Sequence, residues 1–301
     1  MMEKTQFNEQ NKKKNFNLLP AVFVGPHLLI FLVFTLIPFI YGIYISFTDW
    51  DLFTDPVFVG LENFKTILFN QDSSFYKQFW NGLQNTFFFV LITVPFCIMV
   101  PLVLATMLAT RPKLHRLFQA IFYVPSLFAI SAVMIIWQFL LSVSYGPINS
   151  LFGLELNLLS NQPWAWISLV IVTVWWTIGG NLVIYQAAIG GVSGDMLEAA
   201  ELDGANAFQK LTKVVIPSIR FQILYTTIMT TIAQFNVYGQ PLMLTGGGPN
   251  RSTQVLIMNI QQNAFGSGMA RAGIASAMAV MLGVCIMVVS IFQFVLMKKQ
   301  D

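Results

Sequence analysis

Six long stretches of this sequence contain no Asp, Glu, Lys or Arg and consist largely of apolar residues. A helix needs about 20 residues to cross the hydrocarbon core of a bilayer, so each stretch is long enough for one crossing and too short for two. Barrel strands alternate apolar and polar residues, whereas these stretches are apolar on all sides. The sequence therefore predicts an all-α integral membrane protein with six transmembrane helices. The predicted spans are residues 18–47, 83–110, 117–143, 164–189, 221–244 and 272–297.

The composition excludes several other classes of protein. Only 10% of the residues are charged, against about 25% in ordinary soluble proteins, and a water-exposed surface could not accommodate 28 Phe. The two cysteines, Cys97 and Cys285, both lie inside apolar stretches, which argues against a secreted disulfide scaffold. A net charge of +3 is too small to indicate a nucleic-acid partner.

The distribution of Lys and Arg predicts the orientation, because positively charged loops stay on the cytoplasmic side. With the N-terminus inside, both termini are cytoplasmic: a tail over residues 1–17 and a C-terminal segment over 298–301, with the six-span domain at 18–297 and an inner loop at 190–220. On this topology only Lys65, Lys77, Arg251 and Arg271 lie outside. The basic residues on the inner side are Lys4, Lys12, Lys13, Lys14, Arg111, Lys113, Arg116, Lys210, Lys213, Arg220, Lys298 and Lys299.

The spans lack the residues that would let this chain drive transport or catalysis by itself. None contains a formal charge, and ion-coupled carriers usually need buried Asp, Glu or His as relays; the one histidine in a span, His27, is near an end. No Ser with a His or Lys base and no pair of carboxylates is present for an intramembrane hydrolase. We predict no catalytic residue and no metal site, so uphill movement of a solute would need work from another polypeptide.

The Gly-rich run Gly246–Pro249 is not a phosphate-binding loop, because Asn250 and Arg251 follow it in place of Lys and Ser or Thr. We expect a tight turn that ends the fifth span, since glycines adopt the left-handed conformation and Pro cannot continue a helix. Five prolines inside the spans should kink helices, and neighbouring helices can satisfy the carbonyls that they leave free. These prolines are Pro26, Pro38, Pro95, Pro101 and Pro125.

The inner loop between the fourth and fifth spans is predicted to fold. Asp195 followed by Glu198 fits a capping arrangement, which predicts a short helix over 196–202. Gly204 can take the left-handed position after that helix, and residues 205–216 are predicted to form a second helix that Pro217 stops. The result would be a helix-turn-helix on the inner membrane surface, and these features alone leave open a surface hairpin without a partner.

The same loop resembles the EAA loop of permease subunits of binding-protein-dependent ABC importers. The family pattern is EAA, three residues, G, nine residues and I-x-L-P. Here Glu198-Ala199-Ala200, Gly204 and Val214–Pro217 match it with two apolar exchanges. The segments Asp203–Ala205, Leu244–Pro249, Ser46–Trp50, Val59–Phe64 and Asn85–Thr86 are similar to the carbohydrate branch of that family, so the resemblance runs from about residue 21 to 297.

The resemblance implies a type I ABC importer permease fold in a bacterial plasma membrane, with the inner loop as the coupling helix that docks on a cytoplasmic ATPase. Its coupling residues would be Glu198, Ala199, Ala200, Asp203 and Gly204. Implied partners are a second homologous permease subunit, two copies of the ABC ATPase, an extracytoplasmic sugar-binding protein, a sugar substrate and the lipid bilayer. This chain would hold no cofactor, because ATP and Mg²⁺ would bind to the ATPase.

A sugar needs hydrogen-bonding groups and aromatic faces at mid-membrane depth, and the fourth and fifth spans carry both. In maltose-type permeases these mid-span positions contact the sugar, and matching by offset from the motifs selects Thr173, Trp176, Thr177, Thr230, Ala233 and Gln234. Thr230 and Gln234, four residues apart, share a helix face that would line a cavity. The alternative is that such polar residues only join helices, and for any one residue the two roles stay open.

Two other functions remain as alternatives. The first is an ion-coupled secondary sugar carrier, which the absence of charges from the spans disfavours. The second is a membrane scaffold or sensor that binds partners and transports nothing.

Overall fold

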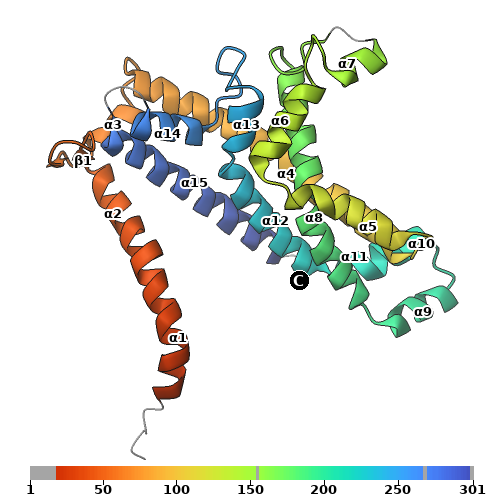
Figure 1. Ribbon diagram of the computed structural model, residues 1–301. Coiled ribbons are helices and arrows are strands. Elements are labelled where there is room, and N and C mark those ends of the chain that lie inside the picture. The colour runs from red at the N-terminus through yellow and green to blue at the C-terminus, as the bar shows by residue number, and fades with distance from the viewer. Residues whose placement is uncertain (1–17, 154–155, 267–269, 299–301) are drawn as a thin grey trace, which may run out of the picture. The chain divides into compact units, whose positions relative to one another are not determined.

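The computed structural model describes residues 18–153, 156–266 and 270–298 (Figure 1). The predicted tail over 1–17 and residues 299–301 of the predicted C-terminal segment lie outside the described residues, together with Lys4, Lys12, Lys13, Lys14 and Lys299. The chain divides into two compact units, residues 1–44 and 45–301. The first unit contains one apolar helix. It consists of α1 (Leu18–Phe31), a π-helical turn η1 (Leu32–Leu36) and most of α2 (Ile37–Ser46). Its described side chains are exposed or half-buried up to residue 44, as expected of a segment that lipid or a partner covers.

The second unit is helical apart from one short antiparallel pair of strands, β1 (Thr48–Asp49) and β2 (Val57–Phe58), in which Thr48 lies opposite Phe58. Its longest helices are α4 (Ser74–Ala109), α8 (Trp164–Gly190) and α15 (Ala272–Lys298), and shorter helices connect them (Figure 1). Up to the inner loop the helices are α3 (Glu62–Leu68), α4 (Ser74–Ala109), α5 (His115–Tyr123), a 3₁₀ turn η2 (Val124–Leu127), α6 (Ile130–Leu140), α7 (Pro147–Phe152) and α8 (Trp164–Gly190). After it come α12 (Arg220–Phe235), α13 (Gly239–Leu244), α14 (Leu256–Phe265) and α15 (Ala272–Lys298).

Four helices in the described part of the chain are long and apolar enough to cross a membrane: Val22–Ser46, Ser74–Ala109, Trp164–Gly190 and Ala272–Leu296. The predicted span 117–143 is not one straight helix. His115–Leu127 and Ile130–Leu140 meet at a bend of 103°, so together they count as at most one further span. The chain turns there because residues 128 and 129 are extended and interrupt the helix. Pro125 itself lies inside η2, so the bend occurs three residues after the predicted kink.

The predicted span 221–244 also departs from a single helix. α12 ends at Phe235, and α13 begins only at Gly239. With 16 residues, α12 is shorter than the about 20 that a perpendicular crossing needs. By contrast, α4 begins at Ser74, well before residue 83, because the Ser73 hydroxyl accepts a hydrogen bond from the Phe75 N–H and caps the helix.

The hydrophobic core forms where α4 packs against α8, with α12, α14 and α15 against the other faces of α4. Among its fully buried side chains are Phe79 of α4, Tyr185 of α8 and Met278 of α15. Gly82 lets α14 cross α4 closely, because a Cβ at this position would stand 2.9 Å from the Leu256 Cα. Residues far apart in the chain therefore touch through small side chains.

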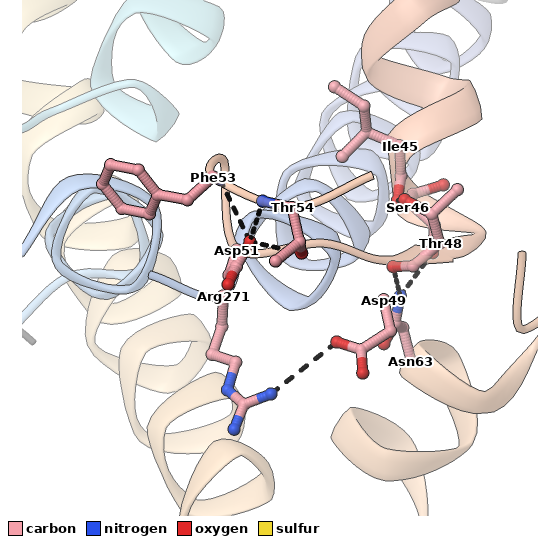
Figure 2. Close-up of polar contacts among 9 residues, drawn as sticks. All are labelled: Ile45, Ser46, Thr48, Asp49, Asp51, Phe53, Thr54, Asn63 and Arg271. Carbon is pink, nitrogen blue, oxygen red and sulfur yellow. Dashed lines mark hydrogen bonds and ion pairs between the residues drawn. The ribbon is translucent and has the colours of Figure 1, made fainter. Parts of the chain in front are cut away.

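A network of polar contacts ties the segment after the first span to the start of α15 (Figure 2). The Asn63 side-chain amide donates to the carbonyls of Ser46 and Thr48, at 2.9 and 2.8 Å. Ala272 N–H donates to the Trp50 carbonyl at 2.8 Å. An Arg271 guanidinium nitrogen stands 3.7 Å from an Asp49 carboxylate oxygen. The β1–α3 segment therefore holds α3 and α15 together.

Candidate functional site

The inner loop begins with α9 (Gly194–Leu202), which matches the predicted helix over 196–202 at its end and starts two residues earlier. The predicted capping by Asp195 and Glu198 is wrong. Ser193 occupies the N-cap position and makes no side-chain cap, while Asp195 lies inside the first turn. A carboxylate there still interacts favourably with the positive end of the helix dipole.

Gly204 ends α9 in the left-handed conformation that its sequence context predicts, with φ of +77°. The Ala205 N–H donates to the Ala200 carbonyl at 2.9 Å and the Gly204 N–H donates to the Glu201 carbonyl at 3.0 Å. These two bonds form a Schellman motif, which satisfies carbonyls that the helix end leaves free. Because an L-residue with a Cβ is strained at this φ, Gly204 determines the angle at which the chain leaves α9.

The second helix of the loop has three parts: α10 (Ala207–Lys210), a π-helical turn η3 (Leu211–Val215) and α11 (Ile216–Ser218). Asn206 and Gln209 form a reciprocal capping box at its start. The prediction that Pro217 stops this helix is wrong. Pro217 lies in the first turn of α11, where a missing N–H is tolerated, and the helical geometry ends at Ile219.

The whole of α9 is free of buried residues, and the predicted coupling residues Glu198, Ala199, Asp203 and Gly204 are exposed; the fifth, Ala200, is half-buried. Two apolar side chains next to these residues are also exposed: Leu202 is 90% and Phe208 71% exposed. The sequence analysis did not identify these two residues. The signal that could have identified them is the presence of an apolar residue on each side of Gly204 in an otherwise polar loop. Exposed apolar side chains of this size mark a surface that a partner covers.

A hollow of about 340 Å³ lies between the two helices of this loop. Ala200, Asp203 and Gly204 line one side, and Gln209 and Lys213 line the other. Across the turn, the Lys210 ammonium and a Glu201 carboxylate oxygen are 3.2 Å apart, which links α9 to α10. The pair is partly exposed, so its contribution to stability is small. The loop is therefore a hairpin held by backbone and capping bonds, with its outer face open.

Within the membrane part, two polar contacts join α8 and α12. The Asn181 side-chain amide donates to the Thr230 hydroxyl at 3.0 Å, and the hydroxyls of Tyr185 and Thr226 are 2.6 Å apart. The members of the two pairs are four residues apart on both helices, as antiparallel neighbours require. These contacts fix the register of α12 against α8.

Asn181 also joins α8 to α4, because its amide donates to the Cys97 carbonyl at 2.9 Å. In an unbroken helix that carbonyl would accept from the N–H of residue 101, which is a proline here. The neighbouring helix thus supplies the bond that Pro101 removes, as the sequence predicts for prolines in membrane spans.

The six predicted pathway residues are distributed over buried and open surfaces. Thr173 is fully buried, and its hydroxyl has no hydrogen-bond partner among the described residues. The Thr177 hydroxyl donates to the Thr173 carbonyl, and the Trp176 ring N–H donates to the Phe128 carbonyl at 3.2 Å.

On α12, Thr230 and Gln234 are buried, whereas Ala233 is exposed. Thr230 serves as an acceptor between helices, which is the joining role that the sequence left open. The pathway role of the set stays a prediction.

The Gly246–Pro249 segment forms the expected turn after α13, with φ of +59° at Gly246 and +82° at Gly247. In the described ranges, no group of three or more His, Cys, Asp or Glu side chains is placed to hold a metal ion. Buried polar groups and one exposed hairpin, then, are the features that carry the functional argument.

The sequence model of a family described as "Binding-protein-dependent transport system inner membrane component" matches residues 73–301. Two relatives cover nearly the whole chain. The "Probable starch degradation products transport system permease protein" of Thermoanaerobacterium thermosulfurigenes is 36% identical over 93% of this chain and 94% of its own length. A "Probable ABC transporter permease protein" of Bacillus subtilis (strain 168) is 32% identical, over 95% of this chain and 91% of its own.

A solved structure has the same fold. A chain of a bacterial ABC transporter involved in the import of the acidic polysaccharide alginate superposes with a TM-score of 0.79, covering 94% of this chain and 95% of its own. At 23% identity this likeness concerns the fold alone.

Proposed function

Because the chain belongs to the family of binding-protein-dependent transport system inner membrane components, we propose that it is a permease subunit of an ATP-driven importer of carbohydrates. Its membrane location follows from the family and from the apolar helices. The name of the relative from Thermoanaerobacterium thermosulfurigenes refers to starch degradation products, and this supports a sugar as cargo. The chain would form half of the translocation pathway, and a second, homologous permease subunit would form the other half.

The observation that carries the proposal is the open inner hairpin. α9 has no buried residue, Gly204 imposes a defined angle, and the apolar side chains of Leu202 and Phe208 are exposed. Exposed apolar side chains beside an unburied helix mark a surface that a partner covers, and a groove on a cytoplasmic ATPase would cover this one. Two copies of that ATPase would bind ATP and Mg²⁺, and this chain would contribute no catalytic residue.

The orientation is part of the proposal. With both termini in the cytoplasm, the hairpin faces the ATPase, and the loops that contain Arg251 and Arg271 face the outside. An extracytoplasmic sugar-binding protein would deliver the cargo to that side. The lipid bilayer surrounds the exposed apolar faces, and no nucleic acid takes part.

The pathway is proposed to follow α8 and α12, where Thr173, Trp176, Thr177, Thr230, Ala233 and Gln234 lie. Two features support this placement. The buried Thr173 hydroxyl has no hydrogen-bond partner in the described part of the chain, so a solute hydroxyl could satisfy it once the helices move. Ala233 lies on an exposed face of α12 together with Tyr225 and Met229, and this face is open to a solute or to the second permease subunit.

The coupling role is tested by changing the hairpin while leaving the membrane part intact. In Gly204→Val a β-branched residue must adopt a left-handed φ, and in Glu198→Lys the charge of the coupling face is reversed. We expect both variants to lose sugar uptake in proteoliposomes and to release the ATPase during purification. Gly194→Ala is the matched control, because a Cβ there meets nothing within 4 Å.

Unimpaired uptake and unchanged ATPase assembly in both variants would contradict the coupling role. Uptake that persists without ATP and collapses with the proton gradient would indicate the secondary carrier. An ATPase that copurifies but whose hydrolysis rate never responds to a solute would indicate the scaffold.

A further inference from the structure

A second hollow lies between α13, the Gly246–Pro249 turn and α14, on the side of the chain opposite to the coupling hairpin in the proposed topology. Its volume is about 420 Å³, within the range of pockets that bind small molecules. Tyr238, Arg251, Gln254, Gln261, Gln262 and Met258 contribute to its lining. None of these residues belongs to the pathway set or to the coupling loop.

The turn that carries Arg251 is rigidly held. Two amides of α4, from Asn81 and Asn85, donate to the Arg251 carbonyl at 3.1 and 2.9 Å, and Asn85 donates also to the Gln254 carbonyl at 3.0 Å. Within the same turn, the Thr253 hydroxyl donates to the Gly248 carbonyl at 2.7 Å. A pocket wall built in this way keeps its shape before a ligand arrives, which lowers the ordering cost of binding.

The backbone of this turn is unusual. Asn250 and Arg251 are both left-handed, with φ of +51° and +60°, although neither is glycine. Such conformations persist only where the surroundings impose them, and they cluster at ligand-binding sites. The hydrogen bonds from the Asn81 and Asn85 amides to the Arg251 carbonyl hold this left-handed conformation. They thereby place the Arg251 side chain at the hollow.

The chemistry of the lining fits a sugar. The Arg251 side chain is exposed, and no ion-pair partner for it exists among the described residues. Gln261 contributes an amide, so this amide and the guanidinium can bond to hydroxyl groups, while Gln262 lines the hollow beside it. Tyr238 and Met258 supply aromatic and apolar surface for the C–H faces of a sugar ring. The combination of planar polar groups with one aromatic ring is typical of sites that bind neutral, hydroxyl-rich ligands.

On these grounds we propose that the hollow is an outer sugar-binding subsite, which holds one or two units of an oligosaccharide before they enter the membrane pathway. The inference rests on the proposed function, because it takes the cargo class and the outward orientation from it. It adds a site and its ligand chemistry in a part of the chain to which neither the coupling motif nor the pathway matching assigns a role.

The test uses the assembled transporter in proteoliposomes. The probe is whichever sugar the wild-type complex takes up from maltotriose, lactose, diacetylchitobiose and arabinotriose. Gln262→Cys is labelled from outside with a membrane-impermeant maleimide, with and without saturating sugar. We expect sugar to slow labelling at least about threefold, because a bound ring would cover the thiol. Gln71→Cys, exposed in the segment before α4, is the matched control, and its labelling rate should not change.

Arg251→Gly and Gln261→Ala, each in the Gln262→Cys background, test the assigned contacts. Gly tolerates the left-handed φ, so the turn survives the first change. We expect the sugar concentration that gives half-maximal protection to rise about tenfold in Arg251→Gly, the cost of one hydrogen bond to a charged group. Lys65→Ala, which removes an outer cation paired with Glu62, should leave that concentration unchanged.

Three results would overturn the inference. Sugar uptake by the Gln262→Cys complex without any protection of the introduced thiol would remove the subsite and leave the proposed function standing. If the sugar-free binding protein protected the introduced thiol and sugar did not, this surface would be a protein-docking site and not a sugar-binding subsite. Absence of ATP-dependent uptake of every sugar in the panel would refute the proposed function and this inference with it.

Discussion

Replacing Asn181 with Leu tests whether one amide compensates for a proline in a neighbouring helix. The change removes the bonds to the Cys97 carbonyl, 2.9 Å, and to the Thr230 hydroxyl, 3.0 Å, while keeping a side chain of similar length. Interhelical hydrogen bonds in membranes contribute about 0.6 kcal/mol each. The Cys97 carbonyl then stays without a partner, because Pro101 has no N–H, and this costs about 1–3 kcal/mol more. The expected loss of stability is about 3 kcal/mol.

The measurement is the melting temperature of the complex in nanodiscs, followed by intrinsic tryptophan fluorescence. By the scaling for folded domains of this size class, the loss corresponds to a decrease in Tm of roughly 6–12 °C. In a Pro101→Ala background residue 101 again has an N–H for the Cys97 carbonyl, so Asn181→Leu should cost at least about 1 kcal/mol less there.

Pro95→Ala is the matched control for this double-mutant cycle. Pro95 lies in the same helix, but the carbonyl that it leaves free belongs to Leu91. Asn181→Leu should therefore cost as much in the Pro95→Ala background as in the wild type. An equal cost in the Pro101→Ala background would refute the argument that Asn181 compensates for Pro101, and so would an unchanged Tm in Asn181→Leu alone.

Three further predictions follow from other contacts. Gly273→Ala should prevent assembly of the complex, measured by size-exclusion chromatography, because its Cβ would stand 1.9 Å from the Thr48 carbonyl oxygen. Tyr185→Phe should lower Tm by a few degrees, since it removes the 2.6 Å contact with the Thr226 hydroxyl and leaves that group buried, whereas Tyr225→Phe on the exposed face of α12 should not. Hydrogen bonds from the Thr54 and Phe53 N–H groups and the Thr54 hydroxyl lower the pKa of Asp51 from 3.8 to about 2. The stabilisation from this carboxylate is therefore fully present above about pH 3.8 and is lost as the pH falls through 2, so Tm should fall less over that window in Asp51→Asn than in the wild type.

Several features could be predicted from the sequence because their causes are local. Gly204 adopts φ of +77° and Gly247 +82°, and in each case a glycine follows a helical segment. The position of α9 was predicted to within two residues from the acidic residues Asp195 and Glu198 near its start and from Gly204 after its end. The N-cap residue of α9 could not be predicted in this way, because Ser193, Asp195 and Glu198 are all residue types that suit a helix N-terminus. Which of them takes the N-cap position depends on how the preceding chain leaves α8.

The candidate pathway shows where local reasoning stops. Thr230 and Gln234 share a helix face, as their spacing requires, and the sequence identified them as polar groups in the membrane. Whether that face meets a cavity or another helix depends on the neighbours of α12, and in this structure Asn181 contacts Thr230. The outer hollow was missed because its lining comes from α13, a turn and α14, and no motif connects them.

By itself, the sequence determined the membrane environment, the apolar segments, the two glycine turns and the hairpin between the fourth and fifth apolar segments, because hydropathy and backbone preference are properties of a few consecutive residues. Only the tertiary structure decided that the predicted third span bends by 103°, that α14 crosses α4 at Gly82 and that Asn181 donates to the carbonyl that Pro101 leaves free. These features depend on which helices become neighbours and in what register. In a bilayer the choice is made by close packing and by the need to pair each polar group, so it belongs to residues that are far apart in the chain.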